Sequence, residues 1–131
     1  MTCKTDIHSI HARHNPLGVF LEGSTVPLLA VTVADCFFAR LVGYLRFRKA
    51  PTNHAMLFPR CRAVHTLGMA FAIDLVWLDE TGKVIAQTES LKPWRFAHCP
   101  KAAMALEMPA SSIASKGIRL HQKMEFRPCA N

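Results

Sequence analysis

The chain lacks a hydrophobic run long enough to cross a bilayer. Its longest apolar stretch in the first third, Val26–Ala34, is shorter than the roughly 20 residues of a membrane helix and follows the charged Glu22. The first residues also lack the apolar core and small-residue cleavage site of a secretory leader. We therefore expect a cytoplasmic protein with no membrane span.

Closely spaced cysteine pairs are also missing. The five cysteines stand at positions 3, 36, 61, 99 and 129, and none forms a Cys-x-x-Cys pair. An odd number cannot all pair within one chain, so a disulfide framework is not expected.

Acidic residues are scarce, nine against sixteen lysines and arginines, which gives a formal net charge of +7. Such an excess suits a nucleic acid, an acidic ligand or simple solubility. A cluster around Arg40, Arg46 and Arg48 falls at the end of a predicted helix, where cations complement the helix dipole. Because no aromatic stacking motif accompanies the basic residues, nucleic acid is the less favoured partner.

The length of 131 residues, half of them apolar, predicts one domain with a real core. Asn15-Pro16 would stop any helix begun before it. We expect residues 1–17 to form a loose arm and residues 18–131 a single globular domain.

Hydrophobic periodicity predicts many short strands and few helices. The clearest local prediction is a hairpin in which Ile73–Leu78 and Lys83–Glu89 are joined by the turn Asp79–Gly82. The main helix is expected at about 34–47, from apolar residues at steps of three and four. The other expected elements are strands at 18–21, 26–33, 55–58, 102–108 and 118–126, an irregular loop at 90–101, and a short helix at about 109–116 closed by Gly117.

These elements together predict an α+β fold. Its sheet would be mainly antiparallel and partly closed, like a barrel, with the main helix packed against it.

The stretch Arg60–Asp79 combines Cys, His, Thr and Met with a Gly-containing turn ahead of an apolar strand. It resembles a motif of the domain of unknown function 192 family, small bacterial and archaeal proteins that often read Val-His-Thr-Phe-Gly-Met-Arg-Phe-Pro-Ile-Asp. Further pieces follow in the family's order, so that the resemblance spans roughly residues 26–126: Ala34–Gly43, Met56–Pro59, Asp79–Val84, Pro93–Arg95, Cys99 and Leu106–Ala110. The family has a shape and no settled activity, so the resemblance implies a fold without naming a reaction, a cofactor or a ligand. Because it places Cys61 and Cys99 near the same loop region, a single bridge between them stays open if the compartment is oxidising.

We expect a site, if there is one, in the loop Cys61–Asp74. The favoured interpretation is a non-enzymatic accessory protein that binds an unknown small ligand or protein there, as a monomer or weak dimer. Trp94 follows Pro93 in a loop, where a large ring either folds back to cover the core, which is the favoured expectation, or stays exposed as a contact anchor. Arg95 could hold a carboxylate or phosphate, or only stack on the Trp94 ring. The candidate ligand-binding residues are His65, Thr66, Met69, Asp74, Trp94 and Arg95.

Two chemical alternatives remain. Cys61, His65 and Cys99 offer thiolate and imidazole ligands that suit Cu(I) or Zn(II), although their spacing matches no zinc-knuckle pattern. The same residues could serve a small hydrolase or redox enzyme, with His65 as base and a cysteine as nucleophile. Asp74 could orient such a base, or it could cap the Leu67–Gly68 turn.

Overall fold

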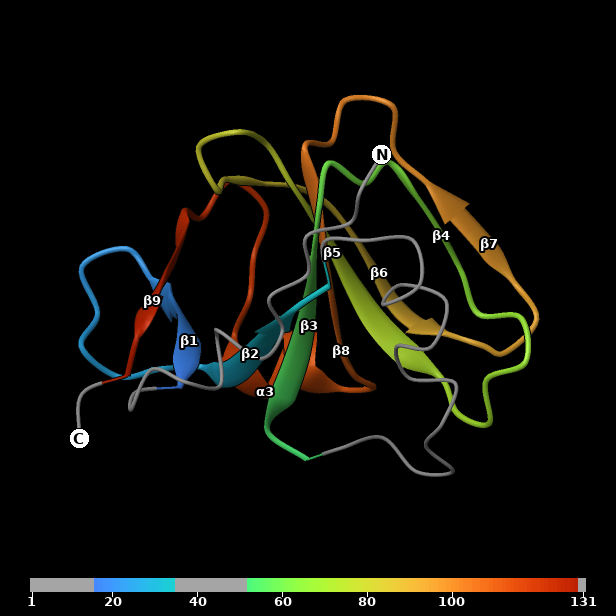
Figure 1. The fold of residues 1–131 in the computed structure, drawn as a ribbon, viewed down its shortest axis with the longest axis horizontal. Helices are drawn as coiled ribbons and strands as arrows, with labels where there is room; N and C mark the ends of the chain where they lie inside the picture. Colours follow the sequence, from blue (N-terminus) through green and yellow to red (C-terminus); the bar gives the residue numbers. More distant parts are fainter. Residues whose placement is uncertain (1–15, 35–51, 130–131) are drawn as a thin grey trace.

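The structure, a computed structural model, describes residues 16–34 and 52–129. Within these ranges it contains nine strands and one short helix (Figure 1). Seven strands form one sheet in the order β6-β5-β8-β3-β2-β1-β9, and β4 pairs with β7 in a separate sheet. The elements are β1 (Leu17–Leu21), β2 (Leu29–Val33), β3 (His54–Pro59), β4 (Ala63–His65), β5 (Ile73–Leu78), β6 (Val84–Leu91), β7 (Phe96–His98), β8 (Met104–Pro109), α3 (Ser112–Lys116) and β9 (Met124–Pro128).

The α+β prediction with a main helix is wrong. The described residues form a β-rich fold whose only helix, α3, is five residues long. Ala34 is not helical, and the remainder of the helix expected at about 34–47 lies outside the described residues. The physical reason is that the core is built from strands: β5 alone buries all six of its residues between β6 and β8.

The larger sheet is also not closed. Its two end strands, β6 and β9, approach each other where Lys83 and Lys123 form an isolated bridge. The Val84 N–H donates to the Gln122 carbonyl at 2.8 Å, and the Met124 N–H donates to the Gly82 carbonyl at 2.8 Å. The ends therefore meet over a few residues, without a continuous strand ladder.

Several predicted elements are confirmed. β1 and β2 pair antiparallel around the Gly23 turn, and β5 pairs antiparallel with β6. The short helix is present as α3, and Gly117 ends it in the left-handed region at φ 65°. The loop expected at 90–101 is partly wrong, because β7 lies within it. The three-residue β4 was not expected either.

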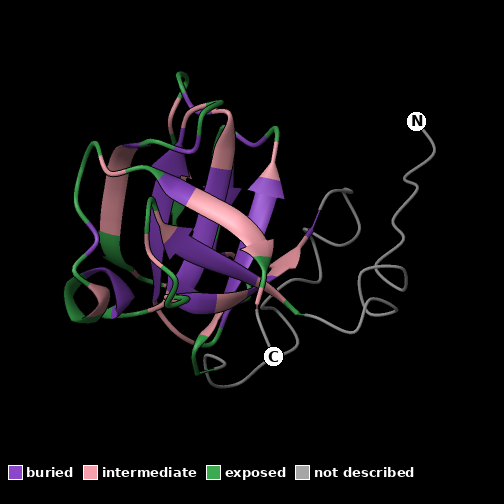
Figure 2. Ribbon diagram, turned by 90° about the vertical axis from the view of Figure 1, so that its left-hand side faces the viewer, coloured by how far each residue is buried: buried purple, intermediate pink, exposed green. Residues whose placement is uncertain are grey.

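Alternate residues of the central strands supply two separate cores, because successive side chains of a strand point to opposite faces. The first core lies within the curl of the larger sheet and includes Val76, Leu106 and Met108. The second core lies on the other face and includes Leu75, Trp77 and Val64 of β4. Figure 2 shows the buried residues concentrated on the strands, with exposed residues mainly in the connections. The second core is what seats the two-stranded sheet on the rest of the molecule.

The expected arm lies outside the described residues, apart from its last two, Pro16 and Leu17. Leu17 already begins β1, where it is in register with Pro128 of β9. Within the described residues, no helix is both long and apolar enough to span a membrane.

Candidate functional site

The two-stranded sheet has one face toward the core and one toward solvent. Val64 is buried in the second core, whereas Ala63 and His65 on either side of it are exposed. On β7, Phe96 and His98 are exposed on either side of Ala97. The register aligns His65 with Phe96 and Ala63 with His98. In Figure 1 this sheet lies at the side of the molecule away from β1 and β9.

Thr66, directly after β4, fixes the loop that leads into β7. Its side chain is fully buried. The Thr66 hydroxyl donates to the Lys92 carbonyl at 2.6 Å and accepts a hydrogen bond from the Arg95 N–H at 2.9 Å. The Thr66 N–H donates to the Arg95 carbonyl at 2.9 Å, and the Thr66 carbonyl accepts from the Trp94 N–H at 3.0 Å. Thr66 therefore acts as a bracket for residues 92–95, and its buried hydroxyl is not a contact point for a ligand.

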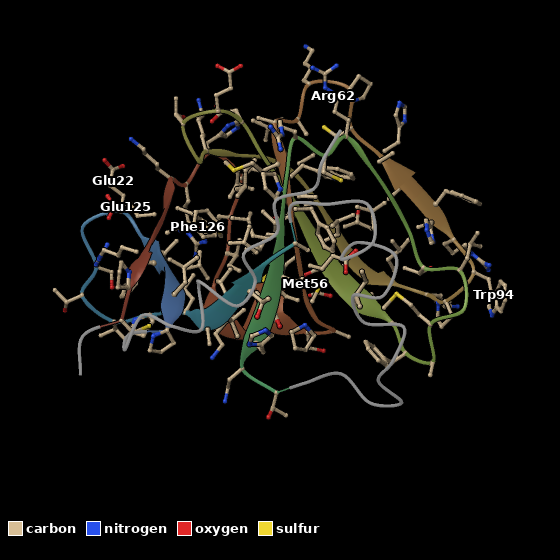
Figure 3. All side chains as sticks on the ribbon, in the orientation of Figure 1. Glu22, Met56, Arg62, Trp94, Glu125 and Phe126 are labelled. Carbon is tan, nitrogen blue, oxygen red and sulfur yellow. The ribbon has the colours of Figure 1, made fainter. Side chains whose placement is uncertain are left out.

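Trp94 is held outward by this bracket. Its backbone is left-handed, with φ 63°, a conformation that is strained for a bulky residue and costs about 1 to 3 kcal/mol. The Trp94 side chain is nevertheless 65% exposed, so burial of the ring does not compensate the strain. Figure 3 shows it at the outer edge of the molecule, while Arg62 lies near the opposite end of the two strands.

A second exposed ring lies two residues along the chain. Phe96 is 73% exposed, and its ring centroid lies 6.3 Å from that of His65 at an interplanar angle of 54°. The Leu67 N–H donates to Nδ1 of His65 at 3.3 Å, which ties the imidazole to the turn that follows it. We call the exposed face made by His65, Trp94, Arg95 and Phe96, together with Arg62 and Lys92 at its margins, the aromatic face.

The remaining expected site residues lie inside the protein. Met69 is buried in the second core. The carboxylate of Asp74 is fully buried and accepts hydrogen bonds from the Ser90 N–H at 2.9 Å and the Ile113 N–H at 2.8 Å. Asp74 therefore joins β5 to β6 and to the start of α3, and it does not cap the Leu67–Gly68 turn.

The three proposed metal ligands are divided between the core and the surface. Cys61 is buried, and its thiol donates to the Ala63 carbonyl at 3.1 Å, whereas His65 is exposed on the outer face. Cys61 and Cys99 are both free thiols. Among the described residues, no three Cys, His, Asp or Glu side chains are close enough together to hold a metal ion.

Sequence reasoning missed two other features. Phe96 was assigned to an irregular loop, although the spacing of Trp94, Phe96 and His98 has the period of a strand. Glu107 of β8 lies between Met56 and Leu75 in the sheet register, and burial raises its pKa to about 8. The available signal in the sequence was a single charged residue within the otherwise apolar run Met104–Met108.

An open, polar hollow of about 290 Å³ lies near one end of the aromatic face. Arg62 and Lys101 line it together with Asp79 and Glu80. The Asp79 carboxylate is already engaged, because it accepts hydrogen bonds from the Thr81 hydroxyl and from the backbone of Thr81 and Lys83. The hydrogen bond from the Thr81 hydroxyl is the main reason that the pKa of Asp79 is lowered.

Comparison with known proteins establishes the family. Residues 20–126 match the profile of the family DUF192, described as an uncharacterized ACR. The chain belongs to this family. No functionally curated protein matches the chain.

Two solved structures share the fold. A protein of unknown function from Novosphingobium aromaticivorans DSM 12444 is 15% identical, with a TM-score of 0.70 over 84% of this chain and 83% of the other. A putative transcription regulator from Sinorhizobium meliloti 1021 is 20% identical, with a TM-score of 0.72 over 86% of this chain and 92% of the other. At these identities, the likeness extends to the fold alone.

Proposed function

We propose that this DUF192 protein is a non-enzymatic accessory protein that recognises a partner through its aromatic face. The single observation that carries the proposal is Trp94, a ring exposed to solvent on a strained backbone that a buried threonine holds in place. Strained conformations persist only where the surrounding structure over-determines them, and they concentrate at functional sites.

The composition of the face supports the proposal. Exposed tryptophan and arginine are the residues most enriched among contact anchors, and here they are adjacent as Trp94 and Arg95. The Arg95 guanidinium makes one described hydrogen bond, a long one of 3.3 Å to the Trp94 carbonyl, which leaves most of its donors for a partner. The proposed site thus includes His65 from the expected Cys61–Asp74 loop and extends onto β7.

The alternative of metal or thiol chemistry has weaker support. Cys61 donates into its own turn from the core, while His65 and Phe96 contact each other at the surface. A shared reaction would need the Cys61 thiol and the His65 imidazole on the same side of β4.

Site-specific photo-crosslinking tests the proposal without knowledge of the partner. A photoreactive phenylalanine analogue replaces Phe96 in one chain and Val26 in a control chain, because Val26 is 69% exposed on the β1–β2 connection. After irradiation in the native host, we expect a discrete adduct from position 96 that position 26 does not give. Equal labelling at both positions, or no adduct at position 96, would refute the proposed function.

A further inference from the structure

We propose that the partner of the aromatic face is a single-stranded nucleic acid. This inference rests on the proposed function and names the chemistry of its partner. Bases would stack on the rings of Trp94, Phe96 and His65, while phosphates would be met by the side chains of Arg62, Lys92 and Arg95.

Two of the three exposed rings are in contact, and the third lies two residues along the chain. Trp94 precedes Phe96 by two residues, and His65 lies across from Phe96 on the neighbouring strand with the ring contact already described. Aromatic rings displayed on a sheet surface are a recurrent way of binding splayed-out bases, because every base has a flat apolar face. A duplex would not expose those faces, so the geometry favours a single strand.

The charge of the two strand segments has one sign. The segments 62–68 and 92–98, which form the two strands and their adjoining turns, contain two arginines and one lysine but no aspartate or glutamate. Arg62, Lys92 and Arg95 are all exposed. In the described part of the chain, no carboxylate forms an ion pair with any of the three. A polyanion with one charge per monomer therefore meets no carboxylate along these two segments, while Asp79 and Glu80 line the hollow beside Arg62.

The face is less suited to the other classes of anionic partner. A peptide anchor needs an apolar pocket, whereas the hollow next to Arg62 is lined by charged side chains. A membrane surface needs a contiguous apolar patch, whereas the polar His65 and Arg95 flank the rings of Phe96 and Trp94.

The sequence alone argued against nucleic acid because no stacking motif was visible. No stacking motif is visible in the sequence because the rings come from two strands and from one residue with positive φ. Their proximity depends on the Thr66 bracket and on the β4–β7 register.

The test titrates the full chain with the octamers of thymidylate and uridylate. Of the two tryptophans, Trp94 is 65% exposed while Trp77 is 2% exposed, so stacking should quench the emission of Trp94. We expect saturable quenching. Between about 50 and about 200 mM salt, the logarithm of the binding constant should fall against the logarithm of salt with a slope of about −2, for three neutralised phosphates at about 0.7 each.

Variants separate stacking from charge when binding is followed by the anisotropy of a labelled octamer. Trp94→Ala should weaken binding about tenfold or more at constant salt slope. Arg95→Gln should reduce the slope by about 0.7. The matched controls Leu120→Ala and Arg119→Gln, exposed residues of the turn before β9, should leave both quantities unchanged.

Three results would overturn the inference: no binding of either octamer, equal binding of an octaglutamate peptide, or tighter binding to vesicles of anionic lipid. A purely protein adduct at position 96 in the crosslinking experiment would also overturn it, while leaving the proposed function intact. Absence of any adduct there would refute both.

Discussion

The backbone N–H of Trp94 donates to the carbonyl of Thr66 at 3.0 Å, across the turns that join the two strands of the smaller sheet. A completely buried polar residue thereby fixes a largely exposed aromatic one. The pair connects the packing of the second core to the exposure of the aromatic face. Substitutions at Thr66 and Trp94 therefore measure how much free energy the exposed conformation of Trp94 costs.

The strain at Trp94 predicts an inverted order of glycine and alanine variants. Because φ is 63° there, Trp94→Gly should be more stable than Trp94→Ala by about 1 kcal/mol. At Phe96, where φ is not positive, Phe96→Gly should instead be less stable than Phe96→Ala by a similar amount. Chemical denaturation of the four variants gives both differences. The same order at both positions would show that Trp94 is unstrained.

Removal of the Thr66 hydroxyl should loosen the loop. Thr66→Val keeps the shape but leaves the Lys92 carbonyl and the Arg95 N–H without their partner, and it should lower the free energy of unfolding by about 2 to 4 kcal/mol. Thr66→Ser keeps the hydroxyl and should cost about 1 kcal/mol. Amide exchange at Trp94 and Arg95 should accelerate in the valine variant, and unchanged exchange there would contradict the role of Thr66 as a bracket.

Asp74 should behave as a structural carboxylate. Asp74→Ala leaves the N–H groups of Ser90 and Ile113 unsatisfied inside the protein, at a cost of about 3 to 5 kcal/mol. The control Asp79→Asn alters a carboxylate in an exposed turn and should cost about 1 kcal/mol. Thermal unfolding compares the two. Similar small losses for both variants would favour a role for Asp74 outside the fold.

Glu107 predicts a decline of stability with rising pH. Burial raises its folded pKa from 4.5 to about 8, so the folded protein holds the proton more tightly than the unfolded chain does. The stabilising contribution is therefore fully present below about pH 4.5 and is lost as pH rises toward about 8, at up to about 1.4 kcal/mol per pH unit.

Denaturation curves across that pH range test this prediction. Glu107→Gln mimics the protonated group and should flatten the decline, whereas Glu125→Gln, which changes a partly exposed carboxylate of β9, should not. A decline that persists unchanged in Glu107→Gln would assign it to another group.

Local patterns made several individual strands predictable, although the fold class that was inferred from them is wrong. The β5–β6 hairpin could be read from an apolar run, the turn Asp79–Gly82 and a second run, because these signals act over neighbouring residues. The end of α3 followed from Gly117, whereas Pro109, expected to begin the helix, ends β8, and α3 begins at Ser112. β4 and β7 escaped prediction because each is three residues long and Pro93 and Pro100 flank β7. Their pairing joins segments far apart in the sequence, and Thr66, directly after β4, bonds residues 92–95, directly before β7.

The site was only partly predictable for the same reason. His65, Trp94 and Arg95 were singled out from residue type and loop position, and all three are exposed, with Trp94 and Arg95 bonded through their backbone to Thr66, the residue after His65. The expectation that Trp94 covers the core is wrong, because its side chain is 65% exposed. By residue type, Thr66, Met69 and Asp74 are equally suited to bind a ligand. Only the tertiary structure reveals that they are buried. Phe96 lacked a motif, and its role depends on pairing with His65.

The most direct test of the aromatic face is the yield of crosslinks from the photoreactive analogue at position 96 in a chain that also carries Trp94→Gly. That substitution removes the exposed ring and relieves the left-handed strain, so a loss of crosslinking cannot be attributed to unfolding when the variant is at least as stable as the Trp94→Ala chain. We predict that the adduct disappears from this folded protein. An adduct of undiminished yield would contradict the assignment of Trp94 as the anchor of the binding face.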